Sequence, residues 1–518
     1  MSANGNGESL FSRLRKAQVG CFLNGEQKFL PLDVLDKEIC EDNVRGALSK
    51  DSVLTQTLKL FPFTPVDQFP RQVVAQAKKV FAILVNIGEP NAIRKLLVEG
   101  LTDDHLPLCL DKDGVTLNSR SGKTFHSFET SMMEQRRSDF VDRQWTVLAP
   151  ILDVSGRHTI LDRRCPLPFE HTEQAGHGVS STVYKSKLHP AHCSGVKSLE
   201  FVATKEFWDE KSFLKENENL KTLASLNHHR LIKHLSTYTR DTTHYVVFPW
   251  ADGGSLRDFW LRENERVRDR ELTMWSLQQM LGIVEAIEAL HGVNCRHGDL
   301  KPENILHFSG ANGGSLIVAD VGVSRSHDKA TQLRHMGTTT RATTPSYEAP
   351  EAFTNHSTPR ARRYDVWSLG CIFLEFALWI LHDIETINSF GYARHSPNFE
   401  FYLLNRDSSE AKRTPEIHPM VTKALALLRK DARCSGGTIF QSFLDLIENR
   451  LLRVKVEFRA EAKDLAQELR LIVQNAEANP MRLLNDVTPP LNKLRFLPRA
   501  QTGSFEPANG AISEHPVV

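Results

Sequence analysis

The stretch Cys295–Leu306, which reads CRHGDLKPENIL, decides the fold of this chain. In it, Lys301 lies two residues after Asp299, and Asn304 lies five residues after Asp299. A carboxylate, a cation and an amide at this spacing suit phosphoryl transfer, which depends on positioning and charge neutralisation more than on covalent chemistry. The alternative is a chance polar loop behind an apolar helix, so the rest of the chain has to decide between the two.

The composition is that of an ordinary globular protein. The chain has 518 residues, of which 40% are hydrophobic and 25% charged, enough for two or three domains. Its net charge of +1 gives no overall attraction to nucleic acid or to an anionic membrane. The eight cysteines include no C-x-x-C pair, so we expect neither a zinc site nor a disulfide framework, but a reducing, cytoplasmic compartment.

No targeting segment or membrane span is expected. The N-terminal residues contain no apolar core of the kind that a secretory signal needs. The most apolar run, Leu369–Leu381, is too short to cross a bilayer and contains Glu375. We therefore expect this run to be a buried helix.

Two motifs precede the opening stretch. Gly176–Val183 follows the pattern G-x-G-x-x-G-x-V, with Ser181 in place of the third glycine. Two glycines let a backbone approach phosphate groups closely, although this signal alone is weak. Val202–Lys205, which reads VATK, then resembles V-A-I-K at the expected distance. The order of the two motifs favours a functional role for Lys205 over that of a solvated strand lysine.

Further motifs follow the opening stretch in a fixed order. Ile317–Gly322 ends in Asp-Val-Gly, where D-F-G is usual. Thr344–Glu351 reads TPSYEAPE, and Tyr364–Gly370 reads YDVWSLG. We expect Arg459 to form a structural ion pair with Glu351.

With these motifs in order, residues 170 to about 475 resemble the eukaryotic protein kinases. The wording of the motifs is similar to the kinases expanded in filamentous fungi. Lys301 with Thr344 resembles the serine/threonine type. The resemblance implies ATP and Mg²⁺ as cofactors and transfer of the γ-phosphoryl group to Ser or Thr of protein substrates.

The resemblance also implies a role for each motif residue. Asp299 would accept or orient the proton of the attacking hydroxyl, while Lys301 would neutralise charge on the transferring phosphate. Asn304 and Asp320 would bind magnesium, and Lys205 would bind the α- and β-phosphates. The implied nucleotide-binding residues are Gly176, His177, Gly178, Val179, Val183, Ala203, Lys205, Phe248, Pro249 and Ala251.

A glutamate on the helix after Lys205 should pair with it, and the sequence leaves its identity open. Counting back from the following Asn-His gives Asn219, which cannot supply a charge. Glu216 lies three residues earlier on the same helix face, and Glu218 points elsewhere. We therefore expect Glu216 to be the partner.

Three departures from the family pattern keep two alternatives open. Gly298 replaces the arginine that in the family binds a phosphate group on the activation loop, which here would be Ser324 to Thr344. We therefore expect that phosphorylation of this loop is not needed to position Asp299. Val321 and Ser181 are the other two departures, and with the open identity of the Lys205 partner they leave a pseudokinase that acts as a nucleotide-binding scaffold as an alternative. The presence of Lys205, Asp299, Asn304 and Asp320 argues against it. His-Gly-Asp also occurs in small-molecule kinases of the aminoglycoside and choline type.

The expected fold is α+β: a two-lobed kinase with an antiparallel small-lobe sheet and a helical large lobe, behind a mainly helical N-terminal region that could bind a protein partner. We place a flexible N-terminus at 1–20, the helical region at 21–140, a linker or packing segment at 141–169, the kinase domain at 170–475 and an extended or disordered tail at 476–518. The small lobe would cover about 170–250 and the large lobe about 251–475.

Overall fold

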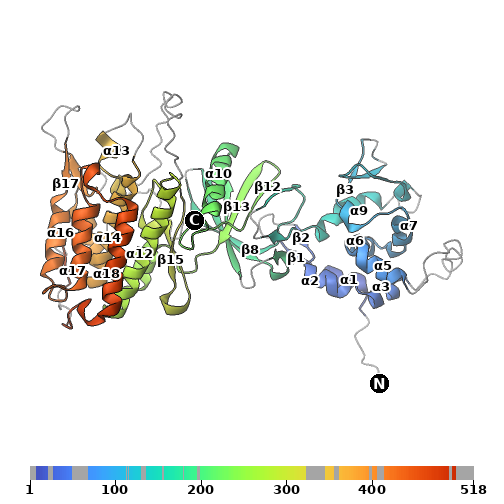
Figure 1. The fold of residues 1–518 in the computed structure, drawn as a ribbon. Coiled ribbons are helices and arrows are strands. Elements are labelled where there is room, and N and C mark those ends of the chain that lie inside the picture. The colour runs from blue at the N-terminus through green and yellow to red at the C-terminus, as the bar shows by residue number, and fades with distance from the viewer. Residues whose placement is uncertain are drawn as a thin grey trace, which may run out of the picture. The chain divides into compact units, whose positions relative to one another are not determined.

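The structure is a computed structural model, and it describes residues 8–21, 27–48, 68–112, 114, 116–129, 136–153, 157–178, 180–194, 199–321, 345–354, 361–395, 400–404, 414–488 and 493–496. The chain forms two compact units (Figure 1). The first comprises Met1–Gln174, Tyr184–Thr204 and His234–Pro249. The second comprises Ala175–Val183, Lys205–Lys233 and Trp250–Val518.

The N-terminal part of the first unit is mostly helical, as predicted. Its central helix is α6 (Lys78–Asn86), in which every residue from Val80 to Val85 is buried. The carboxylate of Asp103 caps this helix by accepting from the backbone N–H groups of Lys79 and Val80, both at 3.0 Å. The surrounding helices are α1 (Leu10–Lys16), α2 (Leu32–Glu38), α3 (Glu41–Leu48), α5 (Phe69–Gln76), α7 (Ile93–Val98) and α9 (Arg137–Arg143).

This region also contains a small antiparallel sheet that the sequence did not indicate. Its strands are β3 (Leu108–Leu110), β4 (Leu117–Ser119) and β5 (Thr124–Phe125). The buried side chain of Gln144 holds β3 in place, because it accepts from the N–H of Leu108 at 2.7 Å and donates to its carbonyl at 2.8 Å. Short 3₁₀ helices connect the elements: η3 (Pro90–Ala92), η4 (Asp103–His105), η5 (His126–Glu129) and η6 (Gln144–Val147).

A second core of the first unit joins N-terminal residues to the main sheet. Cys21, which follows β1 (Val19–Gly20), is buried in one cluster with Leu152, Tyr238 and Val247. Two short strand pairings adjoin these core residues. Strand β1, just before Cys21, pairs antiparallel with β2 (Lys28–Phe29), and β6 (Leu152–Asp153), which contains Leu152, pairs parallel with β10 (Cys193–Ser194).

His192, in the 3₁₀ helix η7 (Pro190–His192), makes further contacts with the N-terminal residues of this unit. Its ring lies edge-on to Phe29, with centroids 5.1 Å apart. Its Nε2 accepts from the backbone N–H of Leu32 at 3.3 Å, and its Nδ1 donates to the carbonyl of Pro150 at 3.0 Å. Since one ring nitrogen accepts and the other donates, the ring is neutral in this geometry.

The main sheet has six strands in the order β7-β12-β13-β11-β9-β8. Strands β12 and β13 are antiparallel, as predicted, but β7 joins β12 in parallel through His158 and the residues that follow. The strand bounds are β7 (His158–Leu161), β8 (Phe169–His177), β9 (Ser181–Leu188), β11 (Phe201–Phe207), β12 (Ser236–Arg240) and β13 (Thr243–Pro249).

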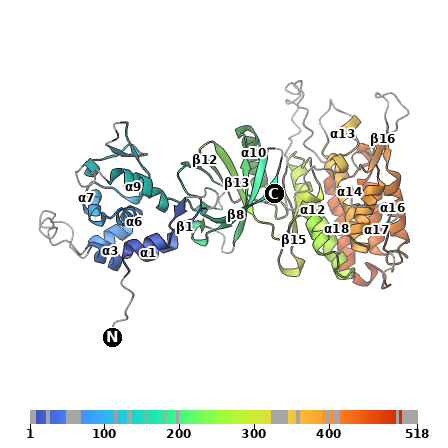
Figure 2. The same ribbon diagram turned by 180° about the vertical axis from the view of Figure 1, so that it is seen from behind.

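The second unit is mostly helical and is organised around α14 (Arg363–Leu381) (Figure 2). Every residue from Tyr364 to Leu381 is buried. Among the described residues, α14 is the one helix long and apolar enough to cross a membrane by length and composition, and its complete burial is that of a core helix. The other helices are α10 (Glu210–Leu226), α11 (Leu256–Arg262), α12 (Arg270–Gly292), α13 (Glu351–Thr354), α15 (Ile384–Ala393), α16 (Pro419–Lys430), α17 (Ile439–Leu446), the π-helix η13 (Ile447–Leu451) and α18 (Ala462–Ala478).

Two hairpins complete the second unit. Strands β14 (Ile305–Phe308) and β15 (Ser315–Val318) pair antiparallel, and so do β16 (Tyr402–Leu404) and β17 (Pro415–Ile417). The 3₁₀ helices of this unit are η8 (Pro302–Asn304), η9 (Ala311–Gly313), η11 (Pro345–Tyr347), η14 (Val456–Phe458) and η15 (Pro480–Arg482).

The segment after residue 476 differs from the extended tail that we expected. Its first residues belong to α18, and Leu483, Leu484 and Phe496 are buried. Arg495 donates to both carboxylate oxygens of Asp383 at 2.9 and 2.8 Å. The described part of this segment is therefore packed, because scattered apolar residues and one arginine fix it without any helical period.

Candidate active site

The catalytic loop, by which we mean Cys295–Leu306, is held by the carboxylate of Asp365, which is fully buried at the start of α14. This carboxylate accepts from the backbone N–H groups of His297 and Gly298, each at 2.9 Å. His291, at the end of α12, donates to it at 2.9 Å. These bonds outweigh the effect of burial, which by itself would raise the pKa of Asp365, and they hold that pKa below its ordinary range.

Gly298 has a backbone φ of +85°. Glycine adopts this left-handed conformation without steric strain, whereas a side chain there would be strained. The departure from the usual arginine therefore has a local backbone reason in this chain.

Asp299 is oriented by two neighbours from the same stretch. The amide of Asn304 donates to the backbone carbonyl of Asp299 at 2.7 Å and to its carboxylate at 3.3 Å. The ammonium group of Lys301 lies 3.0 Å from the same carboxylate. The side chain of Asp299 is 20% exposed, so this carboxylate is fixed in place while it stays accessible.

Lys205 lies between two carboxylates of the second unit. Its Nζ is 3.5 Å from Glu216 and 3.0 Å from Asp320. Burial by itself would lower the pKa of Lys205, but the charges of Asp320 and Glu216 outweigh it and raise the pKa above its ordinary range. The charge of Lys205 in turn lowers the pKa of Asp320, while burial raises the pKa of Glu216.

The structure thus places Glu216, and not Glu218, beside Lys205. Asn219 lies one turn further along α10, where its amide donates to the backbone carbonyl of Val321 at 3.3 Å. Glu216 therefore contacts Lys205, whereas Asn219 contacts Val321 and forms a hydrogen bond with Glu216. The three-residue spacing puts both on one face of α10, which is why counting alone could not separate them.

Asp320 and Asn304 are brought together by the backbone. The N–H of Ala319 donates to the carbonyl of Asn304 at 2.9 Å, and the ring of His297 donates to the carbonyl of Ala319 at 2.9 Å. Asp320 itself has a φ of +50°, a left-handed conformation that is uncommon outside glycine. Such strained positions collect at functional sites, where the surrounding contacts hold them.

The glycine-rich segment forms a tight connection between β8 and β9. Gly176 is buried, and the N–H of Gly178 donates to the carbonyl of Ser181 at 2.7 Å. The exposed ring of His177 packs against Trp208, with centroids 4.8 Å apart. Val183 is buried on β9. Val179 lies outside the described residues.

The remaining residues expected at the nucleotide have the burial of core positions. Ala203 on β11 and Phe248 on β13 are buried in the first unit, where Pro249 ends β13 half-buried. Ala251 is buried in the second unit, and its carbonyl accepts from the N–H of Gly254 at 3.0 Å.

A second cluster of ion pairs and hydrogen bonds surrounds Tyr347 and Glu351, which follow the opening stretch in the chain. Arg459 is fully buried and forms a bidentate ion pair with Glu351, with both N–O distances at 2.7 Å. The hydroxyl of Tyr347 donates to Glu375 at 2.8 Å and accepts from Arg257 at 2.7 Å. The first pair was expected from the sequence, but the Tyr347 network was not. Thr344 lies outside the described residues.

His291 and His297 are site residues that sequence reasoning missed. Both hold the catalytic loop through Asp365 or Ala319. His297 lies inside the opening motif and could have been included. His291 carries no local signal beyond its place at the end of an apolar helix.

A comparison with sequence families agrees with this geometry. The family model described as "Protein kinase domain" matches residues 169–467, which is more than half of the chain. The chain belongs to the protein kinase family. The predicted family and the two-lobed α+β fold are thereby confirmed.

The relatives of this chain are named as protein kinases, and several of them carry serine/threonine names. The chain is 26% identical to serine/threonine-protein kinase dst2 of Dictyostelium discoideum over 49% of its own length and 23% of the relative's. It is 28% identical to calcium/calmodulin-dependent protein kinase type 1 of Caenorhabditis briggsae over 39% and 53%. It is 27% identical to serine/threonine-protein kinase Nek5 of Mus musculus over 48% and 38%. The aligned part is therefore about half or less of each of these relatives.

Proposed function

We propose that the chain is an active serine/threonine protein kinase that uses ATP and Mg²⁺. The observation that carries the proposal is the contact of Lys205 with both Glu216 and Asp320, at 3.5 and 3.0 Å. These two carboxylates fix the buried ammonium group of Lys205 in one position, and phosphoryl transfer depends on such positioning and charge neutralisation.

The residues present fit ATP and magnesium. Asn304 and Asp320 offer an amide oxygen and a carboxylate, and magnesium typically takes one or two such protein groups and completes its shell with water and phosphate oxygens. Lys205 supplies a buried positive charge for phosphate groups. When bound, the metal ion neutralises phosphate charge.

The chain's own groups would then orient the acceptor. The carboxylate of Asp299 is the group able to take or orient a hydroxyl proton, because Asn304 fixes its backbone and Asp365 fixes the loop before it. The ammonium group of Lys301, 3.0 Å from Asp299, can exchange this contact for one with a transferring phosphate. A Ser or Thr hydroxyl of a protein substrate is the acceptor that the relatives' names support.

The test is transfer of ³²P from γ-labelled ATP to a generic Ser/Thr substrate and to the chain itself, in the presence of Mg²⁺. Wild type should label Ser or Thr, whereas Lys205→Ala and Asp299→Ala should not. Lys215→Ala is the matched control, because this lysine is exposed on α10 and should leave transfer unchanged. Asp299→Ala should keep ATP binding, seen as a rise in melting temperature with ATP and Mg²⁺.

Two other results would replace this proposal. A rise in melting temperature with ATP and Mg²⁺ but no transfer by wild type would indicate a nucleotide-binding pseudokinase. Labelling of a small alcohol or amine but of no protein would indicate a small-molecule kinase. Turnover of Asp299→Ala equal to that of wild type would show that the base is a different residue.

We further propose a cytoplasmic location, a protein partner for the N-terminal helical region and a relationship to the fungal kinases. The cysteine pattern and the wording of the motifs support the first and the last. Val98, on α7, is an apolar side chain that is 66% exposed and supports the second. Imaging of the tagged full chain tests the location. Co-purification with and without Val98→Asp tests the partner surface.

A further inference from the structure

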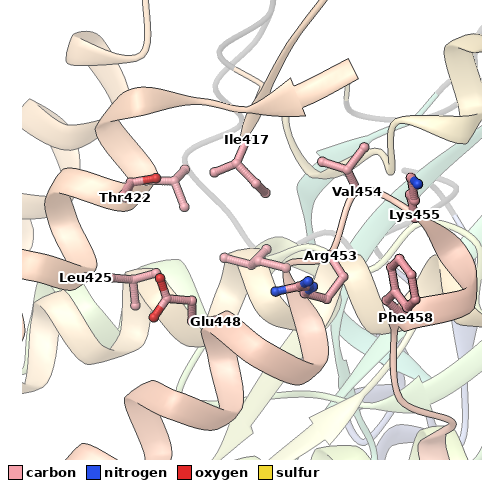
Figure 3. Close-up of a pocket in the computed structure, with 10 residues that line it drawn as sticks. Ile417, Thr422, Leu425, Glu448, Arg453, Val454, Lys455 and Phe458 are labelled. Atoms are coloured by element: carbon pink, nitrogen blue, oxygen red, sulfur yellow. The ribbon is translucent and has the colours of Figure 1, made fainter. Parts of the chain in front are cut away.

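A groove on the second unit lies away from the catalytic residues. It has a volume of about 420 Å³ and is bordered by α16, the π-helix η13 and the segment that leads from it to η14. Figure 3 shows Thr422 and Leu425 on one side of the hollow and Val454, Lys455 and Phe458 on the other.

The floor of the groove is apolar. Val421, Leu425 and Leu452 are buried, while Ile417 and Val454 are half-buried. Phe458 forms one wall and is 54% exposed, although it is a large apolar side chain. An apolar floor with an exposed aromatic wall is suited to receive an apolar side chain of another molecule.

The rim of the groove is positively charged. Arg453 and Lys455 are both exposed, and within the described part of the chain neither lies within ion-pair distance of a carboxylate. The only carboxylate of the lining, that of Glu448, is already paired with Arg429 at 2.6 Å. Among the described residues, Arg453 and Lys455 thus have no carboxylate partner, and Lys455 lies over the ring of Phe458 at 5.7 Å, so this rim favours an entering molecule with acidic groups.

The wall of the groove is connected through Arg459 to Glu351, at the end of the TPSYEAPE motif. The guanidinium group of Arg459 donates to the backbone carbonyls of Arg453 and Val454 at 2.6 and 3.0 Å. The same guanidinium group holds Glu351. Arg459 thus links the wall of the groove to Glu351, the last residue of the TPSYEAPE motif. A position next to this motif suits a docking site for the protein that the kinase acts on.

We propose that this groove docks a segment of the protein substrate in which an apolar side chain is flanked by acidic residues. The apolar side chain would fill the hollow against Phe458, and the acidic groups would meet Arg453 and Lys455. This inference rests on the proposed kinase activity, but peptide binding at the groove can be measured without catalysis.

The first measurement is fluorescence polarisation of a labelled eight-residue peptide made of Asp, Glu, Leu and Phe, with the full-length chain. The double variant Arg453→Glu/Lys455→Glu should bind it at least about tenfold more weakly, and so should Phe458→Ser. Lys423→Glu/Lys430→Glu is the control, because both lysines are exposed on α16 and do not line the groove. Leu471→Ser is the control for Phe458→Ser, since Leu471 is also exposed, at 60%.

The second measurement links binding to catalysis. Fusing the acidic peptide to a Ser-containing substrate peptide should lower its KM by about tenfold with wild type, without raising kcat. The gain should vanish in Arg453→Glu/Lys455→Glu, while the unfused substrate is turned over normally.

Four results would overturn the proposal. Equal peptide binding by wild type and the rim variant would show that the groove is not the site, and preference for a peptide with Lys in place of Asp and Glu would show that the charge argument is wrong. Peptide binding without the expected fall in the KM of the fused substrate would exclude substrate docking. Tighter binding after deletion of residues 497–518 would make the chain's own C-terminal segment the occupant.

Discussion

Removal of Arg459 should destabilise the second unit by several kcal/mol. Its guanidinium group is 0% exposed and makes five hydrogen bonds: two to Glu351 and one each to the carbonyls of Arg453, Val454 and Arg363. Arg459→Met keeps the apolar stem but leaves the Glu351 carboxylate, 15% exposed, without its partner. Breaking a buried pair in this way costs about 3–5 kcal/mol.

The expected loss is a large part of a domain's total stability, which is typically about 5–15 kcal/mol. For a domain of this size it corresponds to a fall in melting temperature of about 10 °C. Urea unfolding followed by tryptophan fluorescence measures it directly. Trp367 is a well-placed reporter, because its buried ring centroid lies 5.2 Å from the guanidinium carbon of Arg459.

Two further variants separate the charge from the packing. Arg459→Met/Glu351→Leu removes both charges and should be less destabilised than the sum of the two single variants, by about 2 kcal/mol or more. Arg450→Met is the control, because Arg450 and Glu468 form a pair in which each side chain is 39% exposed. Its loss should cost about 1 kcal/mol or less. Additive single losses, or a loss for Arg459→Met no larger than that for Arg450→Met, would refute the reasoning.

Three further expectations follow from the site and the first unit. Burial lowers the pKa of His192 from 6.5 to about 4. The stability that neutral His192 contributes is therefore fully present above about pH 6.5 and falls by about 2.5 kcal/mol by pH 4.5. The melting temperatures of wild type and His192→Gln should converge between pH 7 and pH 4.5, and a difference that grows as the pH falls would contradict this. Glu216→Gln should lower ³²P turnover by about tenfold or more because Lys205 loses a charged partner, whereas Glu218→Gln should not; equal losses would reject the pairing. Asp365→Asn should lower stability by about 2 kcal/mol, because an amide offers one acceptor where the carboxylate serves three donors; an unchanged urea midpoint would speak against that anchoring role.

Sequence reasoning succeeded where a motif fixes both the residue type and the spacing. Asp299, Lys301 and Asn304 lie within six residues, so their mutual contacts depend on local geometry alone. The pairing of Arg459 with Glu351 spans more than one hundred residues, yet the order of the motifs was enough to predict it.

Sequence reasoning failed where short elements pair over long distances. The strands β3, β4 and β5 have two or three residues each, too few to show an alternating pattern. Strand β7 has four residues and finds its partner β12 almost eighty residues later. The partner of Lys205 was ambiguous for a different reason, since Glu216 and Asn219 share a helix face and only the contacts of the folded chain separate them.

The parallel pairing of β7 with β12 bears on how this kinase can be shortened. A chain that began at residue 169, where the family match starts, would lack β7 and would expose the backbone N–H and C=O groups of β12 along a free sheet edge. It would also lose Cys21 and Leu152, which cover Tyr238 in the second core. Open edges and uncovered aromatic residues promote aggregation. The catalytic domain as the family defines it is thus shorter than the smallest soluble piece of this chain that we expect.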